Sequence, residues 1–460
     1  MSAESPLETA ERALAIAART GPDFQVTVVR ERSLLSRYAR SAPTQATAVD
    51  DTTVEILCLR EGHSAIASTN RLDDDALRDT ARRAGAAAAA AMRSGPGSHP
   101  GLAEPASPLR HNGFDEATAR LDPQHASHAL ASAFAVAAEH GLEAFGIWTA
   151  GDVRAAIAST TGLRIDDRVS DAFMKVVCRD GDGRSGYAVD AAFAAAAIDA
   201  QALARRAASK VGDEPLVELG PGCYPVVLEP EALGQLLEFL GDLAHNGLAH
   251  AEGRGALDGL LGTPVAAPLV HLSDDPLHAR GLPRAFDMEG VPKAPLTLIA
   301  DGVAANVVHD LRSAALAGDG ARSTGHATQT GGSSWGPSPT NLVLRGGDAA
   351  DAAELAAPIE RGIYVTRLWY VNTVREKETL LTGMTRDGTF LIEDGRISRP
   401  LRDVRFTDSV LRLLEAAEAL TRDGRLVTEG EFYGRRFAHG IVCPAMRASG
   451  FRITGATTGD

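Results

Sequence analysis

The stretch GIYVTRLWYVNTVREKETLLTGMTRDGTFLIEDGRI (362–397) decides the fold class. Short runs of β-branched, aromatic and leucine residues alternate in it with Gly, Asp and Thr, which is the pattern of successive strands and turns. Its last part, RDGTFLIEDGRI (386–397), has an Asp-Gly pair near each end and predicts a hairpin. Further apolar runs, APLTLIADG (294–302) and MRASGFRITG (446–455), predict that the second half of the chain is predominantly β.

Two helices are expected to interrupt this β-rich half. CYPVVLEP (223–230) predicts a strand, and the apolar periodicity that follows predicts a helix over 231–251. A second helix is expected near 408–420.

The first half of the chain mixes helices with strands. Leu7, Ala10 and Leu14 recur at helical spacing, and the acids at 73–75 mark the start of another helix that runs to about 92. EAFGIWTAGDVRAAIAST (143–160) predicts a strand, a turn and a second strand. The other predicted segments are strands at 24–33 and 52–62, loops at 41–49 and 93–110, and helices at 122–139 and 196–211.

A domain boundary is expected where the Pro and Gly content rises, near 212–222. A chain of 460 residues is long enough for more than one core. We therefore predict two unlike α+β domains, 1–215 and 216–460.

Composition excludes several classes of protein. The formal net charge of -14 argues against a protein that grips nucleic-acid phosphates. The N-terminus has no basic start followed by an apolar core, so we expect no secretory signal, and no apolar run approaches the length of a membrane span. The four cysteines are scattered without a CxxC pair, which favours reduced thiols in the cytoplasm.

His245 and His250, in HNGLAH, are candidate metal ligands. Five residues of regular helix separate two side chains by about 140°, so they would share a metal only on a distorted helix, which Gly247 permits. The position of a general base holds Asn246, whose amide cannot accept a proton as a carboxylate does. Ordinary polar histidines near a helix end are the favoured interpretation, and a zinc site is the alternative. Cys443, in IVCPAM, is expected to be a buried thiol.

A second candidate site is the block ARSTGHATQTGGSSWG (321–336). Arg322, Ser323, Thr324 and His326 are expected to bind a peptide or line a cavity. The alternative is a turn whose side chains bond to their own main chain.

Several blocks, in order, resemble a known family. FDMEGV (286–291), STGHA (323–327) and FLIEDGRI (390–397) are the most specific of them. They resemble the TldD/PmbA family, long labelled modulators of DNA gyrase, and the resemblance covers nearly the whole chain. It implies an N-terminal α+β domain and a C-terminal domain dominated by curved mixed or antiparallel β-sheet.

The resemblance also implies a function. TldD and TldE subunits of this family pair around a cavity in which unfolded or modified peptides are cut. The TldD subunit holds zinc through an HExxxH motif and a later cysteine, whereas the TldE (PmbA) subunit lacks the motif. HNGLAH keeps the histidine spacing with Asn246 in the place of Glu, and the ending around Cys443 resembles TldE.

We therefore expect a cytoplasmic TldE-like subunit that binds no metal itself and forms a heterodimer with a zinc-bearing, TldD-like catalytic subunit. Its expected partners are that subunit and a peptide substrate, without nucleic acid or membrane, and a homodimer is left open when the partner is absent. One alternative is a self-sufficient metallopeptidase with zinc on His245 and His250. The other is a non-enzymatic modulator that binds a protein.

Overall fold

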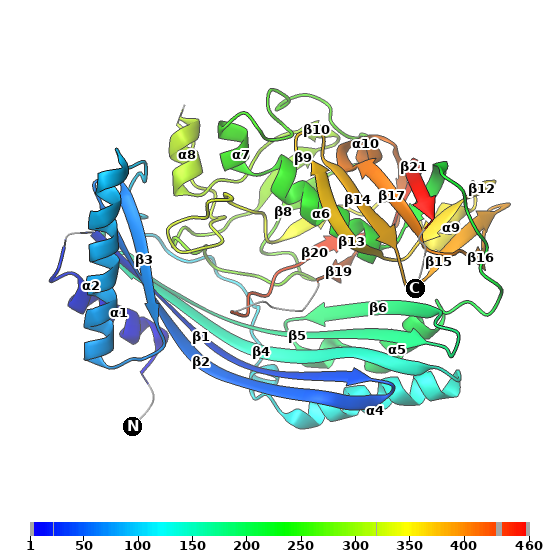
Figure 1. Cartoon of the computed structure of the whole chain (residues 1–460), viewed down its shortest axis with the longest axis horizontal. Coiled ribbons are helices and arrows are strands. Elements are labelled where there is room, and N and C mark those ends of the chain that lie inside the picture. The colour runs from blue at the N-terminus through cyan, green and yellow to red at the C-terminus, as the bar shows by residue number, and fades with distance from the viewer. Residues whose placement is uncertain (1–3, 22, 319, 429–434, 457–460) are drawn as a thin grey trace.

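The N-terminal domain is built on one long antiparallel sheet (Figure 1). The computed structural model describes residues 4–21, 23–318, 320–428 and 435–456. The strands are β1 Asp23–Ala39, β2 Ala42–Arg60, β3 His63–Thr69, β4 Glu143–Ser159, β5 Arg164–Arg179 and β6 Ser185–Ala192. They lie in the order β3-β2-β1-β4-β5-β6, and each pair of neighbours is antiparallel.

Helices pack against this sheet through small side chains. They are α1 Pro6–Ala17, α2 Asp74–Ala91, α3 Glu116–Ala119, α4 Pro123–Glu139 and α5 Ala200–Ala208. Asp73 and Asp122 begin α2 and α4 as N-caps, because their carboxylates accept backbone N–H groups that have no partner within the helix. The alanines of these helices are buried against the strands, which lets helix and sheet approach closely.

Two sequence predictions for this domain are wrong. Residues 41–49 were expected to form a loop, but β2 begins at Ala42 and pairs with β1 along its whole length. The first part of β2 is exposed, so it lacks the apolar alternation that identifies a half-buried strand. Residues 143–159 form the single strand β4, in which Gly151 continues the pairing where a turn was expected.

The C-terminal domain contains a curved mixed sheet (Figure 1). Its strands are β7 Gly222–Leu228, β12 Arg361–Val365, β13 Leu368–Arg375, β14 Leu380–Thr385, β15 Thr389–Glu393, β16 Arg396–Pro400, β17 Val404–Ser409, β18 Ala417–Leu420 and β21 Met446–Ala456. The order is β13-β14-β17-β21-β7-β12-β15-β16, with β18 paired to β21, and only β7 and β12 are parallel among these described strands. The predicted hairpin is confirmed as β15 and β16.

A second, smaller sheet completes this domain. Its strands are β8 Leu272–Asp274, β9 Leu296–Ala300, β10 Val303–Ala304, β11 Leu342–Leu344, β19 Arg425–Val427 and β20 Ile441–Cys443, in the order β10-β9-β8-β11-β20-β19. The helices are α6 Pro230–Ala244, α7 Gly247–Ala251, α8 Leu311–Ala317, α9 Ala352–Ala356 and α10 Val410–Glu415. α6 contacts strands of both sheets, so its leucines belong to the core that joins them.

The helix predictions for this region need correction. The helix expected over 231–251 is two helices, since α6 ends at Ala244 and α7 begins at Gly247. α10 ends at Glu415, and β18 follows where the rest of a helix was expected. In the N-terminal domain, α5 is likewise shorter than the expected 196–211. In the part of the chain that the structure describes, every helix is too short or too polar to cross a bilayer.

Candidate functional site

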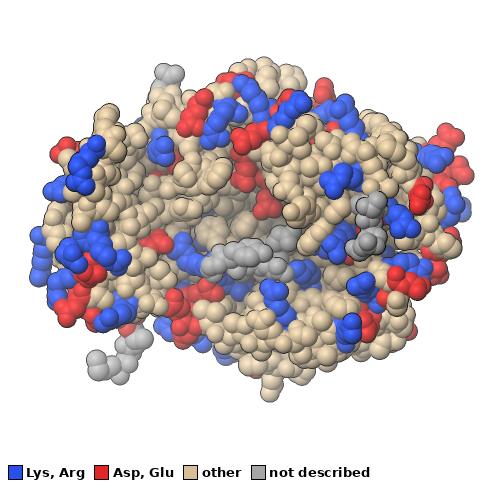
Figure 2. Space-filling model, in the orientation of Figure 1, with Lys and Arg blue, Asp and Glu red and all other residues tan. Residues whose placement is uncertain are grey.

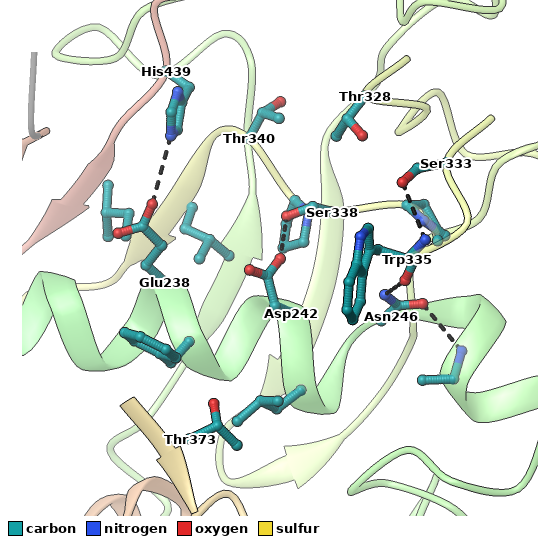
Figure 3. Close-up of a pocket in the computed structure, with 18 of the residues that line it drawn as sticks. Glu238, Asp242, Asn246, Thr328, Ser333, Trp335, Ser338, Thr340, Thr373 and His439 are labelled. Atoms are coloured by element: carbon teal, nitrogen blue, oxygen red, sulfur yellow. Dashed lines mark hydrogen bonds and ion pairs between the residues drawn. The ribbon is translucent and has the colours of Figure 1, made fainter. Parts of the chain in front are cut away.

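A pocket of about 540 Å³ opens along one side of α6 (Figure 3). Figure 2 shows this face of the molecule hollowed between the two domains, with acidic side chains on the wall that the C-terminal domain forms. The pocket is lined by α6, by the loop 328–340, by Thr373 of β13 and by the segment 437–441. Side chains far apart in the sequence therefore meet in one cavity.

The floor of the pocket is a polar stripe on α6, whose opposite face is apolar. Glu238 and Asp242 are four residues apart on α6, so their side chains lie along one face. Asn246, which follows the end of α6, lines the pocket on the same side (Figure 3). Leu233 and Leu237 point to the other side, where they are buried in the core. Core packing of the apolar face thus fixes the direction in which the acids point.

Asn246 ends the stripe and shapes the loop beside it. Its Oδ1 accepts hydrogen bonds from the backbone N–H groups of Leu248 at 3.0 Å and Ala249 at 3.1 Å, so it is the N-cap of α7. Its Nδ2 donates to the carbonyl of Trp335 at 2.7 Å. Gly336 has a φ of +93°, and a Cβ there would lie 2.4 Å from Asn246 Oδ1. Glycine is therefore required for this close approach.

The charged groups of the pocket are mostly acidic. Asp242 accepts a hydrogen bond of 2.6 Å from the Ser338 hydroxyl, and its partly desolvated position raises the pKa of its carboxyl. Glu238 lies 3.6 Å from His439 Nε2. Against the cost of desolvation, this carboxylate raises the pKa of His439 above its usual value.

The segment that carries His439 is anchored to the N-terminal sheet. The guanidinium of Arg436 binds Asp171 of β5 through Nε–Oδ1 and Nη2–Oδ2 contacts of 2.8 and 2.5 Å, and both side chains are 3% exposed. Gly151 makes room for this guanidinium, since a Cβ there would lie 2.3 Å from Arg436 Nε. Phe437 follows on the pocket wall, beneath the guanidinium of Arg284. The N-terminal domain thereby positions one wall of the pocket.

The block 321–336 is divided in the structure between residues that bond to nearby main chain and residues that line the pocket. Ser323 Oγ and the Thr324 N–H both donate to the carbonyl of His309, at 3.2 and 2.9 Å, which is the turn-like bonding of the alternative interpretation. The side chain of His326 is fully buried, with Nε2 3.0 Å from Asp274 Oδ1. Arg322 is exposed and does not line the pocket.

The downstream part of the same block does line the pocket, through Thr328, Gln329, Ser333 and Trp335. Trp335 is 78% exposed, which is high for a large aromatic side chain. In the sequence, this part of the site could have been found from a tryptophan that closely follows the two glycines at 331–332.

Comparison with known proteins supplies the family. Residues 221–455 match the family model described as the PmbA/TldA metallopeptidase C-terminal domain, which is half of the chain. The chain belongs to the PmbA/TldD family. Two curated relatives are each 28% identical to it: a metalloprotease of Methanothermobacter thermautotrophicus over 234 residues and a metalloprotease TldD homolog of Haemophilus influenzae over 248. The matches cover 50% and 53% of this chain and 49% and 47% of those proteins, so the chain spans about half the length of the curated relatives it matches.

Solved structures confirm the α+β fold of two domains. TldE from Thermococcus kodakarensis superposes with a TM-score of 0.85 at 19% identity, covering 97% of this chain and 100% of that one. A Thermotoga maritima protein described as a modulator of a DNA gyrase gives a TM-score of 0.81 at 20% identity, with coverages of 97% and 99%. At 19% and 20% identity, these similarities establish the fold of the chain. They do not establish its activity, which has to be inferred from the residues of the site.

Membership of a metallopeptidase family implies a bound metal ion. In this chain the candidate ligands His245, His250 and Cys443 do not form a complete metal site. His245 caps the C-terminus of α6, and its Nδ1 lies 3.0 Å from the carbonyl of Asn306. His250 lies on α7, beyond the break in the helix. The Cys443 thiol donates to the carbonyl of Pro230 at 3.3 Å, and burial raises its pKa, which disfavours the thiolate that binds metals.

Among the described residues, no group of three or more His, Cys, Asp or Glu is arranged to hold a metal ion. The position of a catalytic carboxylate is occupied by Asn246, which is committed to capping α7. The expectation that this chain binds no metal remains a prediction.

Proposed function

We propose that this chain is the TldE-like, non-catalytic partner of a TldD-like zinc metalloprotease, and that its pocket holds part of an unfolded or modified peptide near the partner's catalytic site. The observation that carries the proposal is Asn246, an amide that stands between His245 and His250 where the family's catalytic subunit would have a glutamate. Instead of offering a carboxylate there, Asn246 caps α7 and fastens the loop of Trp335. The same residue that removes a general base therefore builds a binding pocket.

Free thiols support a cytoplasmic location for the complex. Cys58, Cys178, Cys223 and Cys443 are all unpaired, which is the state that a reducing compartment maintains. Peptide maturation and the degradation of small unfolded proteins are both reactions that such a complex would perform.

Co-purification with a catalytic relative tests the proposal. The tagged chain is co-expressed with an HExxxH-bearing member of the family from the same genome, and cleavage of fluorescently labelled casein is measured for each chain and for the complex. We expect a stable heterodimer whose activity is lost when the relative's motif Glu is changed to Gln. The same activity should survive His245→Gln and His250→Gln in this chain. A pull-down that returns a topoisomerase and no protease would support the modulator alternative instead.

A self-sufficient metallopeptidase is the second candidate, and one observation favours it. His245 Nε2 and His250 Nδ1 are both buried and have no hydrogen-bond partner among the described residues. Metal analysis of the purified chain decides between the two: near-stoichiometric zinc that disappears in the His245→Gln and His250→Gln variants would replace the partner-subunit proposal.

A further inference from the structure

The pocket is one end of a longer groove along α6. A smaller hollow, lined by Glu231, Gln235 and Glu238, shares Glu238 and the segment 439–441 with the main pocket. From Glu231 to Asp242, both on α6, the helix rises by about 16 Å at about 1.5 Å per residue. This is the length of about five extended residues at about 3.3 Å each. The groove therefore matches a short extended peptide segment in length.

The charge of the groove is not balanced by its own cations. Asp242 accepts a hydrogen bond from the Ser338 hydroxyl, and no ion pair joins it to a cation among the described residues. Among the described residues, the one ion pair of Glu238 is with the half-exposed His439, at 3.6 Å. The arginines that line the two hollows are already paired, Arg254 with Glu252 at 2.6 Å and Arg367 with Asp387 at 2.5 Å. Two carboxylates four residues apart are thus left facing the cavity.

Aromatic rings border these carboxylates. Trp335 stands next to Asp242 and Asn246 (Figure 3), and Phe239 and Phe437 belong to the same lining. An exposed tryptophan beside carboxylates suits the side chain of lysine or arginine. Its aliphatic stem packs on the ring, and its charged head is attracted both by the ring face and by the acids.

We propose that this groove selects an extended peptide segment that carries lysine or arginine. A cationic side chain lies between Glu238 and Asp242, with its stem against Trp335. The inference rests on the proposed peptide-binding function and adds the class of peptide that the subunit prefers.

Fluorescence anisotropy of the purified full-length chain tests the preference. The probes are three fluorescein-labelled Gly-Ser decapeptides, each with a central leucine, flanked by two Lys, two Gln or two Glu residues. The test variant is Glu238→Gln/Asp242→Asn. The matched control is Asp75→Asn/Asp79→Asn, which removes two exposed carboxylates at the same helical spacing on α2, in the N-terminal domain.

The Lys peptide should bind the unmodified chain and the control variant more tightly than the Glu peptide does. In the test variant its affinity should fall by about fivefold to tenfold, because exposed ion pairs each contribute up to about 1 kcal/mol. Added salt should remove most of the difference in affinity between the Lys and Glu peptides, because it screens the charges.

The failures are distinguishable. Equal loss in the test and control variants, or equal binding of Lys, Gln and Glu peptides, would overturn the charge preference and leave peptide binding intact. Failure of all three peptides to bind would overturn the peptide-binding function together with the preference.

Discussion

At the scale of single residues, a buried charged side chain should affect the free energy of unfolding more than an exposed one. Lys293 Nζ lies 3.2 Å from Asp274 Oδ1, and the two side chains are 2% and 0% exposed. Lys293→Met leaves the carboxylate buried with less compensation, so we expect the free energy of unfolding to fall by about 3–5 kcal/mol in urea denaturation. The matched control is Lys377→Met, which removes an exposed pair with Asp258. Lys377→Met should lower the free energy of unfolding by less than about 1 kcal/mol. An equal loss in the two variants would contradict the larger effect expected of the buried pair.

Glu289 leads to a different prediction, because it is buried and no ion pair joins it to a cation among the described residues. Its Oε2 accepts the N–H of Leu311 at 2.9 Å, and its Oε1 has no hydrogen-bond partner among the described residues. Burial, reinforced by the charges of Asp287 and Asp310, raises the pKa of Glu289 well above its usual value. A raised pKa in the folded state means that the protonated form stabilises the fold at low pH. This stability is lost as the pH rises through the folded pKa.

Glu289→Gln should remove this pH dependence, since the amide resembles the protonated acid. We expect the variant to gain stability relative to the unmodified chain as the pH rises from the ordinary carboxyl range to neutral and above, measured by urea denaturation at each pH. Glu418→Gln, at an exposed ion pair with Arg447, is the control and should leave the slope unchanged. Parallel profiles for the unmodified chain and Glu289→Gln would show that Glu289 does not titrate in this range.

At the scale of elements, the short helix α7 depends on its cap. Asn246→Ala removes the acceptor for two backbone N–H groups and the donor to the Trp335 carbonyl. We expect a loss of about 1 kcal/mol for the cap, with a further loss for the bond to the loop. Asn246→Asp keeps the acceptor for the cap but sets a carboxylate oxygen against the Trp335 carbonyl in place of the donor. It should therefore recover the contribution of the cap and lack that of the bond to the loop. Urea denaturation of the two variants measures the difference, and equal losses would mean that the cap contributes little.

The same region shows what the sequence could predict. The β-rich C-terminal domain followed from its apolar runs, and the hairpin of β15 and β16 followed from Asp-Gly, because these signals are local. The break at Asn246 was missed because an amide inside an apolar periodicity does not show that its side chain will turn back to cap a helix. Glu238 and Asp242 were missed for another reason. Exposed acids on a helix are usually a solvated face, and only packing against a segment about 200 residues later turns them into the floor of a pocket.

At the scale of the whole molecule, buried ion pairs join the two domains. Arg436 reaches Asp171 in the N-terminal sheet, and Lys210 Nζ lies 2.6 Å from Glu229 Oε2, just before α6. Each pair holds one wall of the groove: the first fixes the segment of His439, and the second fixes the start of the helix. The site is therefore shaped by contacts between domains, and its stability depends on both.

Arg436 is the contact that tests this dependence. Arg436→Met leaves Asp171 buried without its guanidinium, so we expect a loss of about 3–5 kcal/mol in urea denaturation and weaker peptide binding in the groove. Asp171→Asn in the same chain removes the unpaired charge and should restore part of the stability. It should not restore peptide binding, because the segment that carries Phe437 and His439 has still lost its anchor. If the double variant regained peptide affinity along with stability, the groove would depend on general stability alone. If the affinity stayed low while the stability returned, the N-terminal domain would be a positioning part of the binding site.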